Sequence, residues 1–264
     1  MTKIKTSQTI LNTYEKYLAG EECGEYLKLV FIEEKCESRK SVPMAMGERF
    51  EYEALGNRNR KGNIPEAFMN MNGSVSAKQK GITVQSTNFR EWMIKNNYRI
   101  ISKAQGMSLE FDEFFLTGIA DAIIERDGEY IIMDLKYSGN LNNKDSEWGW
   151  HPETLLSHKG KIRQMIIYLY LLNHVEFKEK KINKFIFYVA SSSDENQFVP
   201  FEIVVSDEAI EREMNDIIEL AKQLSFEYEI GLTARPTMGR CQECPAKDIC
   251  TKKGETQSTL ILNF

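Results

Sequence analysis

Several features that would place this 264-residue chain in a special class are missing from its sequence. Its six prolines and 16 glycines form no repeat and no linker, and five cysteines are too few for a small disulfide-held fold. The longest apolar stretch, residues 162–172, contains Arg163 and Gln164 and is too short to cross a bilayer. The first ten residues contain no apolar signal-peptide region. We therefore expect an intracellular, cytoplasmic protein without membrane association.

Positive charge is also scarce: the sequence has 34 Lys and Arg residues but 39 Asp and Glu residues, which gives a net charge of −5. A protein that holds DNA by general neutralisation of phosphates is usually basic, so a nucleic-acid role would need a local patch or metal ions. The chain contains no GxxxxGK[ST] phosphate loop, which excludes a helicase motor of its own. Hydrophobic residues at 42% and charged residues at 28% fit one large globular domain, residues 1–264.

The hydrophobic periodicity predicts an α/β or α+β sandwich, with helices first, a hairpin-led sheet in the middle and helices again. Helices are expected after Ser7, over 43–56, over 87–102, over 161–172 and over 206–229. Strands are expected within 107–137, over 184–190 and over 198–205, with an Asp-Gly hairpin turn at 127–128.

The predicted turn at 127–128 sets the register of two strands that carry acidic residues. Asp121 then lies opposite Asp134, with Cβ atoms about 4.5–5.5 Å apart. Both faces of these strands are largely apolar, so we expect them to be central and covered on both sides. Two carboxylates on a buried face need a neutralising partner. Either Lys136 supplies it in an internal ion network, or a divalent cation bridges the two carboxylates.

The cysteines form a second unusual pattern, since their number is odd and three lie within the last 24 residues. They are Cys23, Cys36, Cys241, Cys244 and Cys250. The last three have the spacing C-x2-C-x5-C, which can hold one metal centre if a fourth ligand comes from elsewhere. Either of the first two could be that ligand. Such a site would join the cysteine-rich segment 231–264 to the N-terminal helical region.

Four motifs follow one another along nearly the whole chain: Gly118-Ile-Ala-Asp121, Asp134-Leu-Lys136, Gln164-x3-Tyr168 and the C-terminal cysteines. This order resembles the RecB-like branch of the PD-(D/E)XK nucleases. It is closest to members with a four-cysteine iron–sulfur cluster, such as AddB-type nuclease domains and CRISPR-associated adaptation nucleases. The resemblance implies a restriction-endonuclease-like core, with a mixed β-sheet flanked by helices. It also implies a helical, iron–sulfur-bearing appendage formed by the two chain ends.

The resemblance assigns ligands to two centres. It favours Cys23 over Cys36 as the fourth ligand of a [4Fe–4S] cluster, because the family's first cluster cysteine follows the first helix; structural zinc is the alternative. The family's usual Cys-Pro pair is Cys-Gly here. Where related proteins carry a metal-binding His four residues after a helix glycine, this chain has Glu51 after Gly47. Glu51 is thus a third metal ligand, or otherwise an exposed helix carboxylate.

The implied function is a Mg²⁺- or Mn²⁺-dependent deoxyribonuclease, acting as an exonuclease on single strands or ends in DNA repair, recombination or phage/CRISPR DNA processing. The expected metal ligands are Glu51, Asp121, Asp134 and the Leu135 carbonyl. Lys136 would orient the nucleophilic water, and Gln164 and Tyr168 would position the substrate strand. Taken from spacing alone, the last two share one helix face and could equally be a solvated edge. The alternative function is a non-catalytic DNA-binding or scaffolding protein with the same fold.

Two further segments have predicted partners. Arg58, Arg60 and Lys61 lie in a basic loop that could contact DNA phosphates or simply be solvated. Residues 257–264, which begin Gln-x-x-Leu and end in Phe, resemble peptides that dock on a bacterial sliding clamp. An added edge strand or a frayed chain end is the alternative for them.

Overall fold

A computed structural model of the protein describes residues 3–38, 40–59, 61–139, 141, 149–177, 181–235 and 238–250. The chain divides into two compact units. The first contains Met1–Arg39, Glu110–Leu116 and Ile217–Phe264, and the second contains Lys40–Leu109 and Thr117–Asp216.

The strands form one mixed sheet, as the sequence predicts. They are β1 (Ile4–Thr6), β2 (Arg99–Glu110), β3 (Phe114–Arg126), β4 (Glu129–Ser138), β5 (Lys184–Ser191) and β6 (Phe198–Val204). The hydrogen-bonded order is β1-β3-β4-β5-β6, and β2 also pairs with β3. The β1–β3 and β4–β5 pairs are parallel, whereas β3–β4 and β5–β6 are antiparallel.

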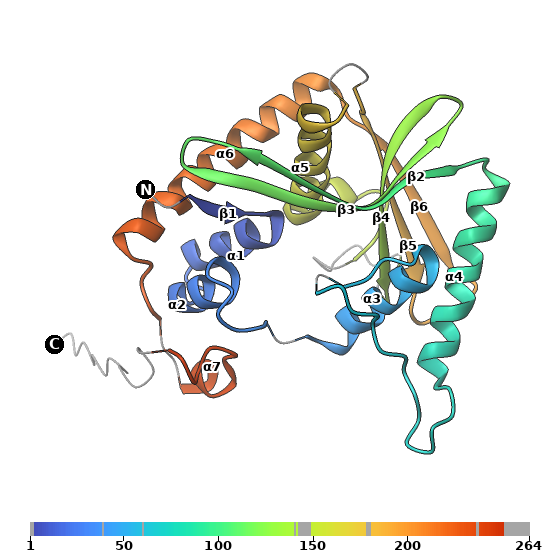
Figure 1. Ribbon diagram of the computed structural model, residues 1–264, viewed down its shortest axis with the longest axis horizontal. Helices are drawn as coiled ribbons and strands as arrows, with labels where there is room; N and C mark the ends of the chain where they lie inside the picture. Colours follow the sequence, from blue (N-terminus) through green and yellow to red (C-terminus); the bar gives the residue numbers. More distant parts are fainter. Residues whose placement is uncertain are drawn as a thin grey trace. The chain divides into compact units, whose positions relative to one another are not determined.

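Helices precede, interrupt and follow these strands along the chain (Figure 1). The longer ones are α1 (Gln8–Leu18), α3 (Val42–Leu55), α4 (Ala77–Lys95), α5 (Lys159–Val175) and α6 (Asp207–Ile230). The shorter ones are α2 (Gly24–Tyr26), the π-helical η1 (Leu27–Ile32), the 3-10 helix η2 (Leu155–Ser157) and α7 (Met238–Glu243). Within the described ranges, no helix has both the length and the apolar character needed to span a bilayer.

The β3–β4 hairpin has the predicted register. Residues 127–128 have φ angles of 54° and 80°, and two positive φ values are typical of the type I′ turns that Asp-Gly favours. Arg126 pairs with Glu129, and the ladder runs on to Ala122 opposite Met133. Continuing this register would bring Asp121 level with Asp134, as predicted.

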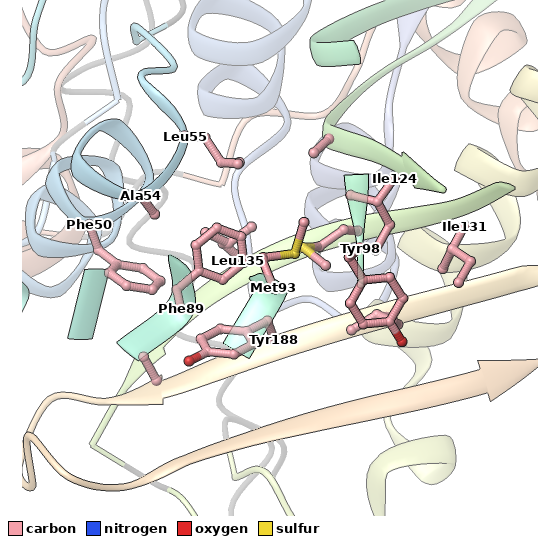
Figure 2. Packing of buried hydrophobic residues seen from close by; sticks show 14 of the residues in the cluster. Phe50, Ala54, Leu55, Phe89, Met93, Tyr98, Ile124, Ile131, Leu135 and Tyr188 are labelled. Carbon is pink, nitrogen blue, oxygen red and sulfur yellow. The ribbon is translucent and has the colours of Figure 1, made fainter. Parts of the chain in front are cut away.

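In the second unit, α3 and α4 cover one face of the sheet (Figure 2). Their apolar side chains pack on the alternate strand residues Ala122, Ile124, Ile131, Met133, Leu135, Ile186, Tyr188 and Ala190. Each fully buried side chain of the larger kinds stabilises the fold by about 1.5–3 kcal/mol. Because neighbouring strand residues point to opposite faces, this packing directs Asp134 to the other face. There, Tyr168 of α5 contacts Phe185 of β5.

The helix predicted over 87–102 is wrong in its bounds. The Ser76 hydroxyl caps α4 by accepting a hydrogen bond from the Gln79 backbone N–H (3.2 Å), so the helix starts ten residues earlier. It ends at Lys95, after which Asn97 takes a φ of 55° and β2 begins at Arg99. The last part of the predicted helix is therefore strand.

Candidate active site

Asp134 is an almost fully enclosed acidic residue of the second unit. It lies on β4 and is 2% exposed. Its Oδ1 accepts a hydrogen bond from Gln164 Nε2 of α5 (2.6 Å), and its Oδ2 lies 2.5 Å from Lys136 Nζ. Gln164 also contacts the Tyr168 hydroxyl (3.3 Å), one helical turn further along. Four of the five residues that the resemblance assigned to the catalytic group are thus linked by a continuous chain of contacts.

Asp121 joins this group through the backbone of the neighbouring strand. Its Oδ2 accepts a hydrogen bond from the Leu135 N–H (2.7 Å). The regular ladder of backbone hydrogen bonds ends one step earlier, at Ala122 and Met133. The Asp121 carboxylate therefore accepts a hydrogen bond from the Leu135 N–H, which would otherwise need a carbonyl oxygen of the neighbouring strand as its acceptor. This contact places the Asp121 side chain beside the strand segment that carries Asp134.

Glu51 reaches the same region from α3. Its Oε1 accepts a hydrogen bond from Asn57 Nδ2 (2.8 Å), and the same Nδ2 donates to the Asp121 backbone carbonyl (2.9 Å). The Glu51 carboxyl also interacts electrostatically with Asp134 and Lys136. The alternative of an exposed helix carboxylate is wrong, because Glu51 is partly buried and hydrogen-bonded.

The electrostatic environment of the buried carboxyl groups at this site favours a bound cation. Burial raises the pKa of Asp121 well above its ordinary value, and the charges of Asp134 and Glu51 raise it further. Burial also raises the pKa values of Asp134 and Glu51. Burial acts to lower the pKa of Lys136, but Asp134 and Asp121 outweigh it and raise that pKa. The Lys136 ammonium group therefore has to offset the negative charge of three neighbouring carboxyl groups, those of Glu51, Asp121 and Asp134.

The donor chemistry of the site fits a divalent cation such as Mg²⁺ or Mn²⁺, which prefers carboxylate and carbonyl oxygens. Asp134 Oδ2 is buried with no hydrogen bond of regular geometry and only the Lys136 ion pair beside it. In the part of the chain that the structure describes, however, no three His, Cys, Asp or Glu side chains are already arranged to hold a metal ion.

Comparison with known proteins places this site in a family. A sequence model of the PD-(D/E)XK nuclease superfamily matches residues 40–251. The chain belongs to the PD-(D/E)XK nuclease superfamily. The match contains every residue of the candidate active site, and Asp134-Leu-Lys136 supplies the D-X-K element in the superfamily's name.

Two solved structures are similar to this PD-(D/E)XK protein to different degrees. A candidate exonuclease from Eubacterium rectale is similar with a TM-score of 0.63 and 17% identity, over 92% of this chain and 86% of that chain. The alkaline exonuclease LHK-Exo from Laribacter hongkongensis has a TM-score of 0.38 and 12% identity, over 86% of this chain and 90% of that chain. A search of curated proteins finds no match. The first comparison supports the restriction-endonuclease-like architecture.

Gly118, the first residue of the Gly-Ile-Ala-Asp motif, leaves room for Tyr168. A Cβ at position 118 would lie 2.8 Å from Tyr168 Cε1 and 3.3 Å from Leu171 Cδ1. Burial is the main cause that raises the Tyr168 pKa to about 12, and the negative charge of Asp134 raises it further. This phenol therefore stays protonated at neutral pH. The glycine thus allows a protonated hydroxyl to approach the PD-(D/E)XK site.

We expect Gly118→Ala to destabilise the protein by about 1–3 kcal/mol, because the new methyl group overpacks the Tyr168 ring. Chemical denaturation would measure this loss. In a Tyr168→Ala background the same substitution should cost much less, which a double-mutant cycle would show. Gly106→Ala in β2 is the matched control, since no atom lies within 4 Å of its added Cβ. Equal losses at the two glycines would contradict the expectation.

The predicted DNA-binding loop lies directly after α3. Arg58 and Lys61 are exposed, and Arg58 donates a hydrogen bond to the Gly62 carbonyl (3.1 Å). Arg60 and the clamp-like tail 257–264 lie outside the described residues. Contacts of these segments with DNA or a clamp stay predictions.

Four of the five cysteines line one pocket of the first unit: Cys23, Cys241, Cys244 and Cys250. Burial raises the pKa of Cys244, and the thiols of the other three raise it further. Cys36 is not among the lining residues, although it packs against the same apolar cluster, Leu29, Val30 and Ala246, as Cys244 and Cys250 do. The structure therefore brings together the four cysteines that the resemblance selected, although their role as metal ligands stays a prediction.

The Cys-Gly departure from the family pattern has a local explanation. A Cβ at Gly24 would lie 2.5 Å from the Thr233 carbonyl oxygen, and the Gly24 N–H donates a hydrogen bond to that oxygen (3.1 Å). A proline at position 24 would place its ring where there is no room for added atoms, and it would have no backbone N–H to donate to the Thr233 carbonyl. The close approach of residues 232–233 thus excludes proline after Cys23.

Sequence reasoning missed Asn57. It treated residues 57–63 as a basic loop, yet this side chain is 5% exposed and bonded to the carboxylate and carbonyl described above. A signal was present, since Asn57 follows Gly56, the glycine that ends α3. A helix-ending glycine turns the chain back toward the helix it has left.

Proposed function

We propose that this protein is a Mg²⁺- or Mn²⁺-dependent deoxyribonuclease of the RecB-like branch, acting as an exonuclease on single strands or DNA ends. The observation that supports it best is the buried contact set of Asp134, with Lys136 on one carboxylate oxygen and Gln164 on the other. This is a D-X-K element with a helix partner, in a chain that belongs to a nuclease superfamily.

Glu51, Asp121, Asp134 and the Leu135 carbonyl would hold the cation. A bound divalent ion would polarise the scissile phosphodiester and lower the pKa of a bound water. The raised pKa values of the three carboxyl groups support this assignment, because burial disfavours the ionised form of each group. For Asp121 and Glu51 the charge of neighbouring carboxylates disfavours ionisation further.

The remaining chemistry would come from side chains of the protein. Lys136 would orient the attacking water or offset negative charge that develops on the phosphate oxygens. Gln164 would keep the Asp134 carboxylate in one orientation through the 2.6 Å hydrogen bond. Tyr168 would help to position the substrate strand by donating a hydrogen bond from its protonated hydroxyl. The exposed Arg58 and Lys61, together with Arg60, would contact phosphates.

We further propose that Cys23, Cys241, Cys244 and Cys250 hold a [4Fe–4S] cluster that joins the N-terminal helical region to the cysteine-rich segment 231–264. Their shared pocket supports this proposal, and four thiolates are the usual ligands of such a cluster. The whole chain, residues 1–264, would then act as one nuclease domain with this appendage.

The test is cleavage of an end-labelled single-stranded oligonucleotide by the purified protein. We expect shortening products with Mg²⁺ or Mn²⁺ and none with excess EDTA. Asp134→Ala and Lys136→Ala should reduce cleavage to background while still binding DNA. Equal cleavage by all three proteins would refute the active site. DNA binding without cleavage by any of them would favour the non-catalytic scaffold.

A further inference from the structure

Asn57 connects helix α3 to strand β3 through a single amide group. Gly56 ends α3 with a φ of 82°, and this left-handed residue turns the chain back so that the next side chain faces the helix. The Asn57 side chain is 5% exposed. Its Nδ2 donates to Glu51 Oε1 (2.8 Å) and to the backbone carbonyl of Asp121 (2.9 Å).

These two contacts determine which way the amide points. Both partners are oxygens that accept hydrogen bonds, and only the NH₂ end of an asparagine side chain can donate to them. Its two protons satisfy two acceptors at once. One acceptor belongs to a metal-ligand candidate and the other to the backbone of a second. The amide therefore fixes the Glu51 carboxylate relative to the Asp121 main chain.

A fixed Glu51 carboxylate matters for cation binding because α3 and β3 are separate elements. A glutamate has three rotatable side-chain bonds, so an unrestrained carboxylate would have to be ordered when the cation binds. Outer partners that hold metal ligands in place typically contribute 10–100-fold to metal affinity. Asn57 has the burial, the donors and the position for such a role.

We infer that Asn57 is a positioning residue, which orients Glu51 toward Asp121 and thereby sets the affinity of the active site for its divalent cation. This inference rests on the proposed function for the identity of the site, but it concerns metal binding and not the chemical step. Asn57 itself contacts neither the substrate nor the cation.

The experiment is calorimetric titration of the full-length protein with Mn²⁺ in the absence of DNA. We expect Asn57→Ala to weaken binding about 10–100-fold. Asn57→Leu keeps the approximate size but carries neither donor nor charge, so it should weaken binding by a similar factor. In cleavage assays Asn57→Ala should raise the half-saturating Mn²⁺ concentration by a similar factor, whereas the rate at saturating Mn²⁺ should stay close to that of the wild type.

Asn173→Ala is the matched control, since Asn173 also makes two hydrogen bonds, both to Ile182, far along α5 from the site residues. It should lower thermal stability without changing the Mn²⁺ affinity. Unchanged Mn²⁺ affinity in Asn57→Ala, or in Asn57→Leu should the first variant not fold, would overturn the inference. So would a wild-type protein that binds no Mn²⁺. A wild type that binds Mn²⁺ but cuts no DNA would refute the proposed function alone, because the affinities of the variants would still decide the role of Asn57.

Discussion

Asp121→Asn is expected to stabilise the metal-free protein and at the same time to abolish its nuclease activity. Burial and the neighbouring charges of Asp134 and Glu51 raise the pKa of this carboxyl, so its ionised form is unfavourable in the folded state. Asparagine removes the charge and can still accept the hydrogen bond from Leu135 through its side-chain oxygen. The melting temperature in EDTA should rise by about 2–4 °C for each kcal/mol of repulsion relieved.

The pH dependence of this effect has a defined sign. Since the folded-state pKa of Asp121 lies above the unfolded value of about 3.9, the folded protein holds this proton more tightly. The stability that comes from the protonated acid is complete below the unfolded pKa and is lost as the pH rises through the folded pKa. Asp121→Asn should therefore differ little from the wild type in acid and be the more stable protein at neutral pH.

Divalent metal should reverse the order of the two proteins. At a Mg²⁺ concentration 100 times its dissociation constant, binding stabilises a folded protein by about 2.7 kcal/mol. The wild type should gain this stability, whereas Asp121→Asn should gain little and should lose cleavage by at least about 100-fold. Asp127→Asn is the matched control, because it makes the same change at the exposed turn of the same hairpin. A metal-free Asp121→Asn protein less stable than the wild type would contradict the expected repulsion.

The sequence was most informative where local geometry decides the structure. An Asp-Gly turn takes the two positive φ values of a tight hairpin, and this fixes the strand register up to the acidic residues. Residues 164 and 168 share a helix face because they are four apart. Local rules of this kind predicted the sheet and the hairpin, whereas the grouping of Gln164 and Tyr168 with Asp134 was implied only by the resemblance to the nuclease family.

Long-range contacts account for what local rules missed. The hydrogen bond from Leu135 to Asp121 replaces a ladder contact, and no strand pattern predicts such a replacement. Asn57 acts across 64 residues of sequence, on the carbonyl of Asp121. The early start of α4 depends on one serine cap in a stretch without clear apolar periodicity. Each of these features depends on which elements meet in space.

Exchange of single cysteines for serine is expected to separate the true cluster ligands from the fifth cysteine. The spacing of the cysteines left Cys23 and Cys36 as competing fourth ligands. The structure places Cys23 in the pocket with the three C-terminal cysteines, where its sulfur accepts a hydrogen bond from the Arg235 N–H (3.2 Å). Cys36 points its thiol toward the Leu29 carbonyl at 3.9 Å.

We expect anaerobically purified wild type to be brown and to contain about four iron atoms per chain. Cys23→Ser and Cys244→Ser should lose the iron and the visible absorbance. Both should also lose several kcal/mol of stability, because a centre bound only by the folded chain stabilises that fold. Cys36→Ser, the matched control, should keep colour, iron and stability. Iron retained in Cys23→Ser but lost in Cys36→Ser would reassign the fourth ligand, and a colourless wild type containing zinc would replace the cluster with a structural zinc site.

Because Cys23 lies before α2 and the other three ligands lie after α6, the centre would connect segments more than 200 residues apart in the sequence. An unfolded chain seldom brings such distant segments together, so the centre would bind the folded chain almost exclusively. Removing one thiol should therefore destabilise the protein more than removing any single surface contact.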